Sequence, residues 1–229
     1  MTMTASDGTE ISYLAAGRGP AVFLLHGFAS AAMSWWTIGA AQRLARRGRV
    51  IAPDIRGHGE SDKPTDASFY GNRLLADLAE LLDHEGEDTV DVAGFSMGAE
   101  IGLAFAVRYP HRVLSLTLAG SGWSPEGIVA EYRKWFEILA PASDTPDALA
   151  ALIEGVPDLT GLSEEDVAGI DVPLHGIIGE HDDERRWMER IAEARPNFTP
   201  HVLPGVDHMG TWRSPDFPGL LAGVVTGDE

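Results

Sequence analysis

The chain has 229 residues, enough for one sizeable hydrophobic core, and α/β folds of this length are commonly single domains. Hydrophobic residues make up 44% and charged residues 23%, which argues against a disordered or fibrous protein. The formal net charge is −18, so the surface repels nucleic acid and anionic lipid, and a strongly anionic substrate would need a local basic patch to capture it.

The chain contains no cysteine, which excludes disulfides, thiolate metal sites and cysteine nucleophiles. The N-terminus has neither a basic segment nor an apolar segment of the secretory type. No apolar run approaches the roughly 18–20 residues that a membrane span needs. We therefore expect a cytoplasmic protein without a membrane span, as a monomer or a homodimer.

The first predicted element is a β-hairpin, because Asp7-Gly8 is a turn signal and residues 11–16 alternate as a strand does. After it, short apolar runs alternate with segments of helical spacing. Strands are expected at 21–25, 49–53, 90–95, 113–119, 174–178 and 199–203, and helices at 35–47, 69–85, 97–109, 184–194 and 217–225. This alternation predicts an α/β fold with a mostly parallel β-sheet and helices on both faces.

Residues 123–172 interrupt the alternation, because they contain helical patches at 128–139 and 147–154 but no clear strand. We interpret this stretch as a short helical cap inserted over one end of the sheet. The core domain would then consist of residues 1–122 and 173–229.

The strongest chemical signal is Gly94-Phe95-Ser96-Met97-Gly98, which matches G-x-S-x-G between a predicted strand and a predicted helix. A nucleophile on such a sharp turn has a strained backbone, so small residues must flank it. The helix N-terminus also brings backbone N–H groups beside the serine. These features predict Ser96 as a nucleophile; the alternative is a glycine-rich turn with an incidental serine.

A serine hydroxyl needs a base, and the base needs a carboxylate to orient it. His208 is the preferred base because it is the last of eight histidines and lies in a loop after a predicted strand. Asp182 is the preferred acid because it follows the strand ending near Gly179, where active-site residues of open α/β sheets collect. Asp183 and Glu180 remain competitors, and a solvated acidic loop is the structural alternative.

The oxyanion of the reaction needs donors fixed in advance. The Met97 N–H, which follows the nucleophile, is one predicted donor. The second is expected in the loop after the strand that ends at Leu25, where His26-Gly27 leads to Phe28, and we choose the Phe28 N–H. A simple turn is the alternative for this loop.

Large apolar side chains near these positions are candidates for a substrate pocket, with core packing as the alternative for each. The preferred candidates are Phe28, Trp35, Phe95, Trp123 and Met209, followed by Trp36, Trp135, Phe136 and Trp212. Glu100 is interpreted as an acidic residue in the first turn of a helix. His181 beside Asp182 and Asp183 lacks a second histidine at ligand spacing, so we expect neither a metal nor another cofactor.

Five segments in this order resemble the α/β-hydrolase family, in the branch with small esterases, lactonases and meta-cleavage-product hydrolases. They are His26-Gly27-Phe28, the stretch from Pro53 to Asp62, Gly94-Phe95-Ser96-Met97-Gly98, Gly179-Glu180-His181-Asp182 and Gly205-Val206-Asp207-His208. The resemblance covers nearly the whole chain outside 123–172. It implies that the loop from Asp54 to Asp62 is structural, so Asp54, Arg56 and His58 receive no catalytic role.

Three departures from the family pattern affect the expected chemistry. Phe95 stands where members often carry His or Gln, and Ala99 follows Gly98 where Gly is frequent, which should make the pocket drier. A serine nucleophile disfavours the haloalkane dehalogenases and epoxide hydrolases of this fold, which use Asp. The short cap implies a smaller or more open pocket.

The resulting expectation is a cofactor-free hydrolase of a small carboxylic ester or lactone, with a Ser96–His208–Asp182 triad. A C–C hydrolase of meta-cleavage products uses the same triad and is one alternative. A ligand-sensing protein on a hydrolase scaffold is another, although the triad is intact. A cofactor-independent oxygenase or lyase has no positive feature in the sequence.

Overall fold

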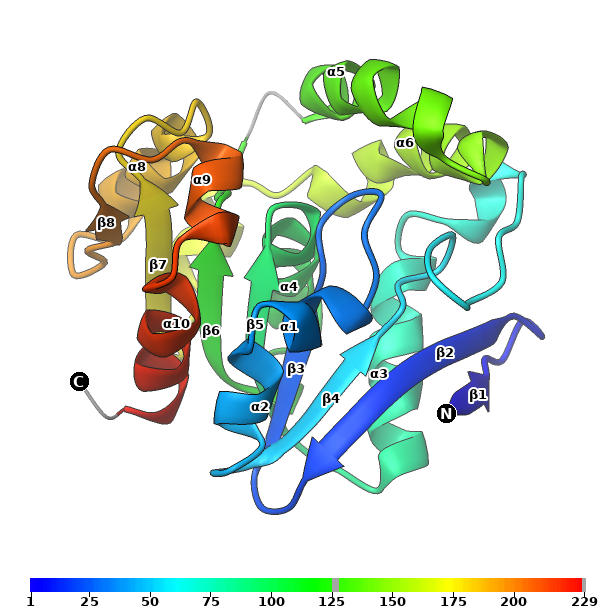
Figure 1. Cartoon of the computed structure of the whole chain (residues 1–229), viewed down its shortest axis with the longest axis horizontal. Helices are drawn as coiled ribbons and strands as arrows, with labels where there is room; N and C mark the ends of the chain where they lie inside the picture. The colour runs from blue at the N-terminus through cyan, green and yellow to red at the C-terminus, as the bar shows by residue number, and fades with distance from the viewer. Residues whose placement is uncertain (125–127, 228–229) are drawn as a thin grey trace.

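A computed structural model describes the protein over residues 1–124 and 128–227, and its centre is an eight-stranded sheet (Figure 1). The strand order is β1-β2-β4-β3-β5-β6-β7-β8. The strands are β1 (Thr2–Thr4), β2 (Glu10–Gly17), β3 (Ala21–Leu25), β4 (Arg49–Pro53), β5 (Val90–Phe95), β6 (Val113–Ala119), β7 (Leu174–Gly179) and β8 (His201–Leu203). Only the pairings of β2 with β1 and with β4 are antiparallel, so the predicted mostly parallel sheet is confirmed.

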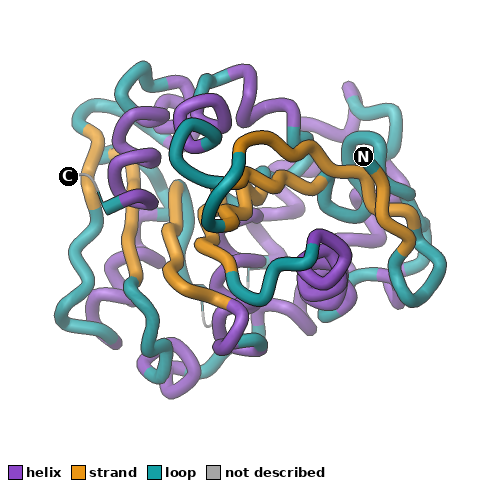
Figure 2. The backbone as a smooth tube through the Cα atoms, turned by 90° about the horizontal axis from the view of Figure 1, so that it is seen from below, coloured by secondary structure: helices purple, strands orange, loops and turns teal. Residues whose placement is uncertain are grey.

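Helices lie on both sides of the sheet, as the view from below shows (Figure 2). They are α1 (Met33–Thr37), α2 (Ala40–Leu44), α3 (Arg73–Glu85), α4 (Met97–Arg108), α5 (Val129–Leu139), α6 (Pro146–Thr160), α7 (Glu164–Ala168), α8 (Arg185–Ala194), α9 (His208–Arg213) and α10 (Phe217–Thr226). Within the described part of the chain, none of them combines the length and apolarity that crossing a lipid bilayer requires.

The strand β3 shows why its sequence is apolar throughout. Successive side chains of a strand point to opposite faces of the sheet. Phe23 and Leu25 join the core cluster that contains α3, α4 and α8, whereas Val22 and Leu24 join the cluster that contains α1, α2 and α10. Because helices cover both faces, every residue of β3 is buried and no polar side chain is tolerated.

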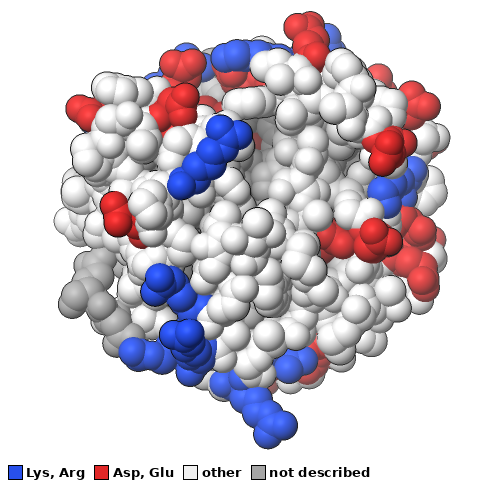
Figure 3. Space-filling view, in the orientation of Figure 1, with Lys and Arg blue, Asp and Glu red and all other residues white. Residues whose placement is uncertain are grey.

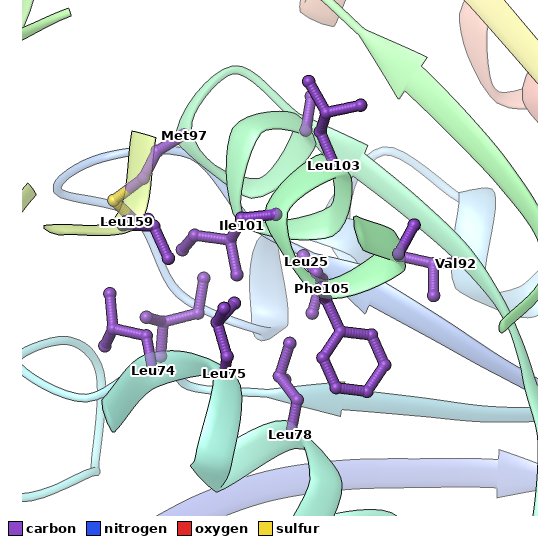
Figure 4. Packing of buried hydrophobic residues seen from close by; sticks show 14 of the residues in the cluster. Leu25, Leu74, Leu75, Leu78, Val92, Met97, Ile101, Leu103, Phe105 and Leu159 are labelled. Carbon is purple, nitrogen blue, oxygen red and sulfur yellow. The ribbon is translucent and has the colours of Figure 1, made fainter. Parts of the chain in front are cut away.

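The leucine spacing of α3 matches its packing (Figure 4). Leu74, Leu75 and Leu78 point toward Ile101 and Phe105 of α4, and all five side chains belong to one buried cluster. Removing a leucine side chain from water in this way contributes roughly 1.5–3 kcal/mol. This contact fixes α4, the helix that follows Ser96.

Glycines account for two differences from the predicted helices. The single helix expected at 35–47 is two short helices, because Gly39 between them is left-handed with φ of 85°. The helix expected at 69–85 begins at Arg73, after a 3₁₀ turn and Gly71, whose φ is 64°. A left-handed residue breaks the helical hydrogen-bond pattern, and glycine adopts this conformation without steric cost.

The helices α5 and α6 lie above the carboxyl ends of the parallel strands in Figure 1. Their side chains, including Tyr132 and Leu152, join the core cluster of the sheet. The helix α6 extends past the predicted end at 154 and continues through Pro157. Residues 125–127 of the predicted cap lie outside the described residues, and the division into core domain and cap stays a prediction.

Arg56 is a fully buried cation that connects three distant segments. Its guanidinium donates to Asp7 beside the first hairpin and to Asp77 on α3, both at 2.6 Å, and to the Thr9 hydroxyl at 2.9 Å. Hydrogen bonding to Arg56 holds the pKa of Asp7 well below its usual range. The contacts support the structural role expected for the loop that contains Arg56.

We expect Arg56→Met to lower the free energy of unfolding by about 3–5 kcal/mol, because it leaves buried carboxylates without their counter-ion. Urea denaturation measures the change. Arg185→Met is the matched control, since its pair with Glu189 is exposed and contributes only about 0.5 kcal/mol. Equal losses in the two variants would contradict a structural role for the buried cation.

Candidate active site

Ser96 lies at the turn between β5 and α4, the strand–turn–helix arrangement that the sequence predicted. Its backbone has φ of 53° and ψ of −120°, a conformation that costs a non-glycine residue about 1–3 kcal/mol. A hydrogen bond of 2.8 Å from the Ser96 N–H to the Ala119 carbonyl helps to hold the turn.

The two glycines of the motif are required by close backbone contacts. A Cβ atom at Gly94 would overlap the carbonyl group of Gly98, and a Cβ atom at Gly98 would overlap the carbonyl of Leu25 at the end of β3. Small residues are therefore necessary on both sides of the turn, as the steric argument from the sequence expected.

His208 is the first residue of α9, a helix that the sequence analysis did not predict. The available signal was Asp207, whose carboxylate caps this helix by accepting a 2.7 Å hydrogen bond from the Gly210 N–H. The His208 Nδ1–H donates to Asp182 Oδ2 at 3.0 Å. The structure thus brings together the predicted base and the preferred acid, 26 residues apart in sequence.

The competing acids lie elsewhere. The Asp183 side chain is 84% exposed and sits 3.9 Å from the Lys134 ammonium group. Glu180 is exposed and accepts a hydrogen bond from a backbone N–H of the loop after β8. The Asp182 side chain is fully buried, and only its carboxylate is hydrogen-bonded to His208 among these three acids.

Neighbouring negative charges and burial have opposite effects on the pKa of the His208 imidazole. Burial lowers its pKa, but the hydrogen bond to Asp182 and the charges of Glu184, Asp182 and Asp207 outweigh burial, so the pKa is raised. The rings of Phe95 and Trp135 lie 5.1 and 5.4 Å from the imidazole, between ring centres. A base in this setting is confined by aromatic side chains and stabilised when it takes up a proton.

Ser96 and His208 line one cavity of about 400 Å³, within the range of small-molecule sites. The surface is hollowed below α5 and α6 in Figure 3, and most of the side chains around this hollow are uncharged. The lining residues are Gly27, Phe28, Ala29, Ser30, Phe95, Ser96, Trp135, Ile138, Leu139, His208, Met209, Trp212 and Arg213.

Three of the five preferred pocket candidates line this cavity, and two do not. The prediction for Trp35 is wrong, because α1 packs on the sheet and buries this ring against Trp212 at 4.8 Å between ring centres. The prediction for Trp123 is wrong, because its indole N–H donates to the Leu162 carbonyl and its ring faces a separate hollow beside α7 and α8. Trp212 lines the cavity instead.

The residues of the predicted oxyanion donors, Phe28 and Met97, line a small cavity together with Ser96. Met97 is the first residue of α4, where backbone N–H groups have no partner within the helix. Among the hydrogen bonds of residues 1–124 and 128–227, neither the Met97 N–H nor the Phe28 N–H donates to a protein acceptor. The Phe28 ring contacts the rings of His58 and Tyr132 edge-on, which fixes its loop.

His26 and His58 are buried close to the site but are unsuited to act as its base. Burial lowers their pKa values to about 4 and about 3, so both are neutral at physiological pH. His26 Nε2 accepts a 3.0 Å hydrogen bond from the Ile55 N–H. Asp54 likewise accepts a backbone hydrogen bond, from Ala32 at 2.7 Å. These contacts hold two loops together.

Comparison with known proteins identifies the fold. A family model described as alpha/beta hydrolase fold matches residues 20–160. The chain belongs to the α/β hydrolase fold family. This α/β hydrolase is 30% identical over 208 residues to a 2-hydroxy-6-oxo-2,4-heptadienoate hydrolase of Pseudomonas putida, covering 84% of this chain and 71% of that protein.

Solved structures show the same fold. An enol-lactonase from Burkholderia xenovorans is 21% identical to this α/β hydrolase, with a TM-score of 0.79 and coverage of 99% of this chain and 100% of that chain. A thermophilic esterase from Thermogutta terrifontis is 24% identical, with a TM-score of 0.80 and coverage of 99% and 96%. At these identities the likeness concerns the fold alone.

We expect Gly98→Ala to lower the melting temperature of this α/β hydrolase by several degrees, because the new methyl group forces α4 away from β3. Thermal unfolding followed by circular dichroism measures the shift. Gly219→Ala in α10 is the control, since nothing lies within 4 Å of its Cβ position. A Gly98→Ala variant as stable as Gly219→Ala would refute the close-contact explanation.

Proposed function

We propose that the protein hydrolyses carboxylic esters or lactones through an acyl-enzyme on Ser96. The observation that carries the proposal is the hydrogen-bonded pair of Asp182 and His208 at one cavity with Ser96, which has the strained turn that exposes a nucleophile. The family membership of the chain supports the same class of reaction.

In the acylation step, Ser96 Oγ attacks the substrate carbonyl carbon while His208 Nε2 takes the hydroxyl proton. The Nδ1–H of the imidazolium stays bonded to Asp182, which stabilises its positive charge. The carbonyl oxygen becomes an oxyanion and accepts hydrogen bonds from the Met97 and Phe28 N–H groups. When the intermediate collapses, His208 returns the proton to the leaving alcohol.

Deacylation repeats the sequence with water. His208 removes a proton from the water, the hydroxide attacks the acyl carbon, and the proton then returns to Ser96 Oγ as the acid leaves. In a lactone the alcohol and the acid are parts of one product. The cavity of about 400 Å³ and its largely apolar lining favour a small substrate with an apolar body.

We expect Ser96→Ala to abolish turnover of p-nitrophenyl acetate while the fold persists. Asp182→Asn should lower kcat by about 10⁴-fold, because the imidazole then adopts the wrong tautomer. Asp183→Asn, which removes the same charge next door, should stay within about twofold of the parent protein, since Asp183 faces solvent. Stopped-flow or steady-state release of p-nitrophenol gives these values.

Covalent labelling provides an independent check of the nucleophile. A fluorophosphonate should add one group to the parent protein, at Ser96, and none to Ser96→Ala, as mass spectrometry would show. Ester cleavage at the full rate by Ser96→Ala would overturn the proposal, and so would equal losses in Asp182→Asn and Asp183→Asn.

A second candidate function is hydrolysis of a C–C bond in a meta-cleavage product. The P. putida relative is named for a dienoate, a substrate that carries a carboxylate. Arg213, exposed at the end of α9, is the only Lys or Arg among the described residues that line the cavity. In a chain of net charge −18, this cation is suited to attract an anionic substrate to the cavity.

If the substrate carries a carboxylate, we expect Arg213→Gln to raise its KM by about 5- to 10-fold at low salt, with little change in kcat. KM for the neutral p-nitrophenyl acetate should stay unchanged. Arg133→Gln is the control, because Arg133 is exposed on α5 and does not line the cavity. Turnover of a dienoate without cleavage of neutral esters would favour the second function.

A further inference from the structure

Two buried carboxyl groups lie beside the active site and have no part in the proposed mechanism. Glu100 is on α4 and Glu184 immediately precedes α8, and each is only 5% exposed. The interpretation of Glu100 as an acid of a helix N-terminus accounts for its position but not for its burial, which is costly for a charged group.

Glu100 is held by two hydroxyl groups. The Ser121 hydroxyl donates to Glu100 Oε1 at 2.7 Å, and the Tyr132 hydroxyl donates to Glu100 Oε2 at 2.6 Å. The same Ser121 hydroxyl lies beside the Glu184 carboxyl. Ser121 therefore connects the two acids.

Glu184 faces the imidazole of His208. Glu184 Oε1 lies 3.9 Å from His208 Nδ1, the nitrogen that also bonds Asp182. Glu184 Oε2 is buried and has no hydrogen-bond partner among the described residues. Because 3.9 Å is too long for a hydrogen bond, Glu184 acts on His208 through its charge.

The two acids also share a small cavity with the nucleophile. It has a volume of about 10 Å³, close to the minimum for a single water molecule. Its lining residues are Phe28, Ser96, Met97, Glu100, Ile128, Glu131, Tyr132, Trp135 and Glu184. The charges of Glu100 and Glu184 thus act over short, poorly screened distances on the site.

Two buried carboxyl groups this close resist simultaneous ionisation. Burial raises the pKa of Glu100, against the hydrogen bonds from Tyr132 and Ser121. Burial also raises the pKa of Glu184, and the charge of Glu100 adds to this effect while that of His208 opposes it. Ionisation of Glu100 therefore opposes ionisation of Glu184.

We propose that Glu184 is a positioning residue that acts on His208 as a second carboxylate, and that Glu100 governs how far Glu184 is ionised. The proposal rests on the proposed function only in assigning His208 as the base. Among the described residues, the titratable and polar groups around Glu184 come from five places: His208 from α9, Asp182 from the loop after β7, Glu100 from α4, Ser121 from the loop after β6, and Tyr132 and Glu131 from α5.

Substituting the two acids should shift the pKa of His208 in opposite directions. Glu184→Gln removes the carboxylate that forms near Nδ1 when Glu184 ionises, so the pKa of His208 falls. Glu100→Gln removes the repulsion on Glu184, which then ionises more fully, so the pKa of His208 rises. Because the acid limb of kcat/KM follows this pKa in the free enzyme, the limb should move to lower pH in Glu184→Gln and to higher pH in Glu100→Gln.

The test measures both quantities. The pKa of His208 is followed by NMR titration of ¹³C-histidine-labelled protein without substrate, with His208→Gln identifying the resonance. The pH profile of kcat/KM is recorded with p-nitrophenyl acetate. We expect shifts of about half a unit or more in each variant. Glu193→Gln, an exposed residue of α8 with the same charge change, should shift neither quantity.

A variant that does not fold is replaced by a milder one. Tyr132→Phe removes a hydrogen bond that favours the ionised form of Glu100. It should therefore shift the pKa of His208 in the same direction as Glu100→Gln does, but by a smaller amount. Thermal unfolding identifies the variants that qualify.

The proposal is overturned if Glu184→Gln leaves the His208 titration unchanged, or if the Glu184 variant and the Glu100 or Tyr132 variant shift it in the same direction. The proposed function fails separately, if Ser96→Ala still cleaves esters, because the NMR titration needs no turnover.

Discussion

The close backbone contact between the first turn of α4 and the end of β3 determines the geometry of the site. With glycine at position 98, the helix approaches the Leu25 carbonyl, and Ser96 is forced into its strained conformation. The same approach brings the N-terminus of α4 next to the loop that carries Phe28. The strained turn at Ser96 and the positions of the two proposed oxyanion donors therefore result from one packing arrangement, which the leucines of α3 support from behind α4.

The relative positions of His208 and Asp182 depend instead on the direction of the strands. Parallel strands end at the same edge of the sheet, so loops after β7 and β8 meet beside the turn after β5. Near this edge, the charged side chains and the apolar side chains occupy different places. The surface carries most of a large negative charge, while the cavity wall is mainly aromatic and aliphatic. Among the described residues, the buried charged side chains are paired, as Arg56 is, or hydrogen-bonded to backbone N–H groups, as Asp54 is, or are acids whose pKa burial raises.

Sequence patterns predicted the strands well and the pocket only in part. The strand β3 is buried on both faces, so an uninterrupted apolar run gives its limits directly. The order of Ser96, Asp182 and His208 follows from the fold, which is why these positions could be predicted to meet. The hydrophobicity of a tryptophan does not show whether its ring packs in the core or lines a pocket. Trp35 was therefore predicted to line the pocket, although it belongs to the core.

The contributions of Trp135, Glu100 and Glu184 depend on how α5 lies over the sheet. Apolar residues that recur about every 3.6 positions show that α5 has an apolar face. They do not show which core residues this face contacts. Glu184 lies two residues after the triad acid in a strongly acidic loop, where nothing in the composition separates a buried carboxyl from a solvated one. Only the packing shows that Glu184 turns inward, as Asp182 does.

The hydrogen bond between Tyr132 and Glu100 has a consequence for how substrates enter. Moving α5 away from the sheet would separate the buried carboxyl from its donor and would withdraw Trp135 from His208. Both changes carry an energetic penalty, so the covering helix is anchored rather than hinged. We therefore expect small molecules to enter the cavity beside Ser96 without a movement of α5.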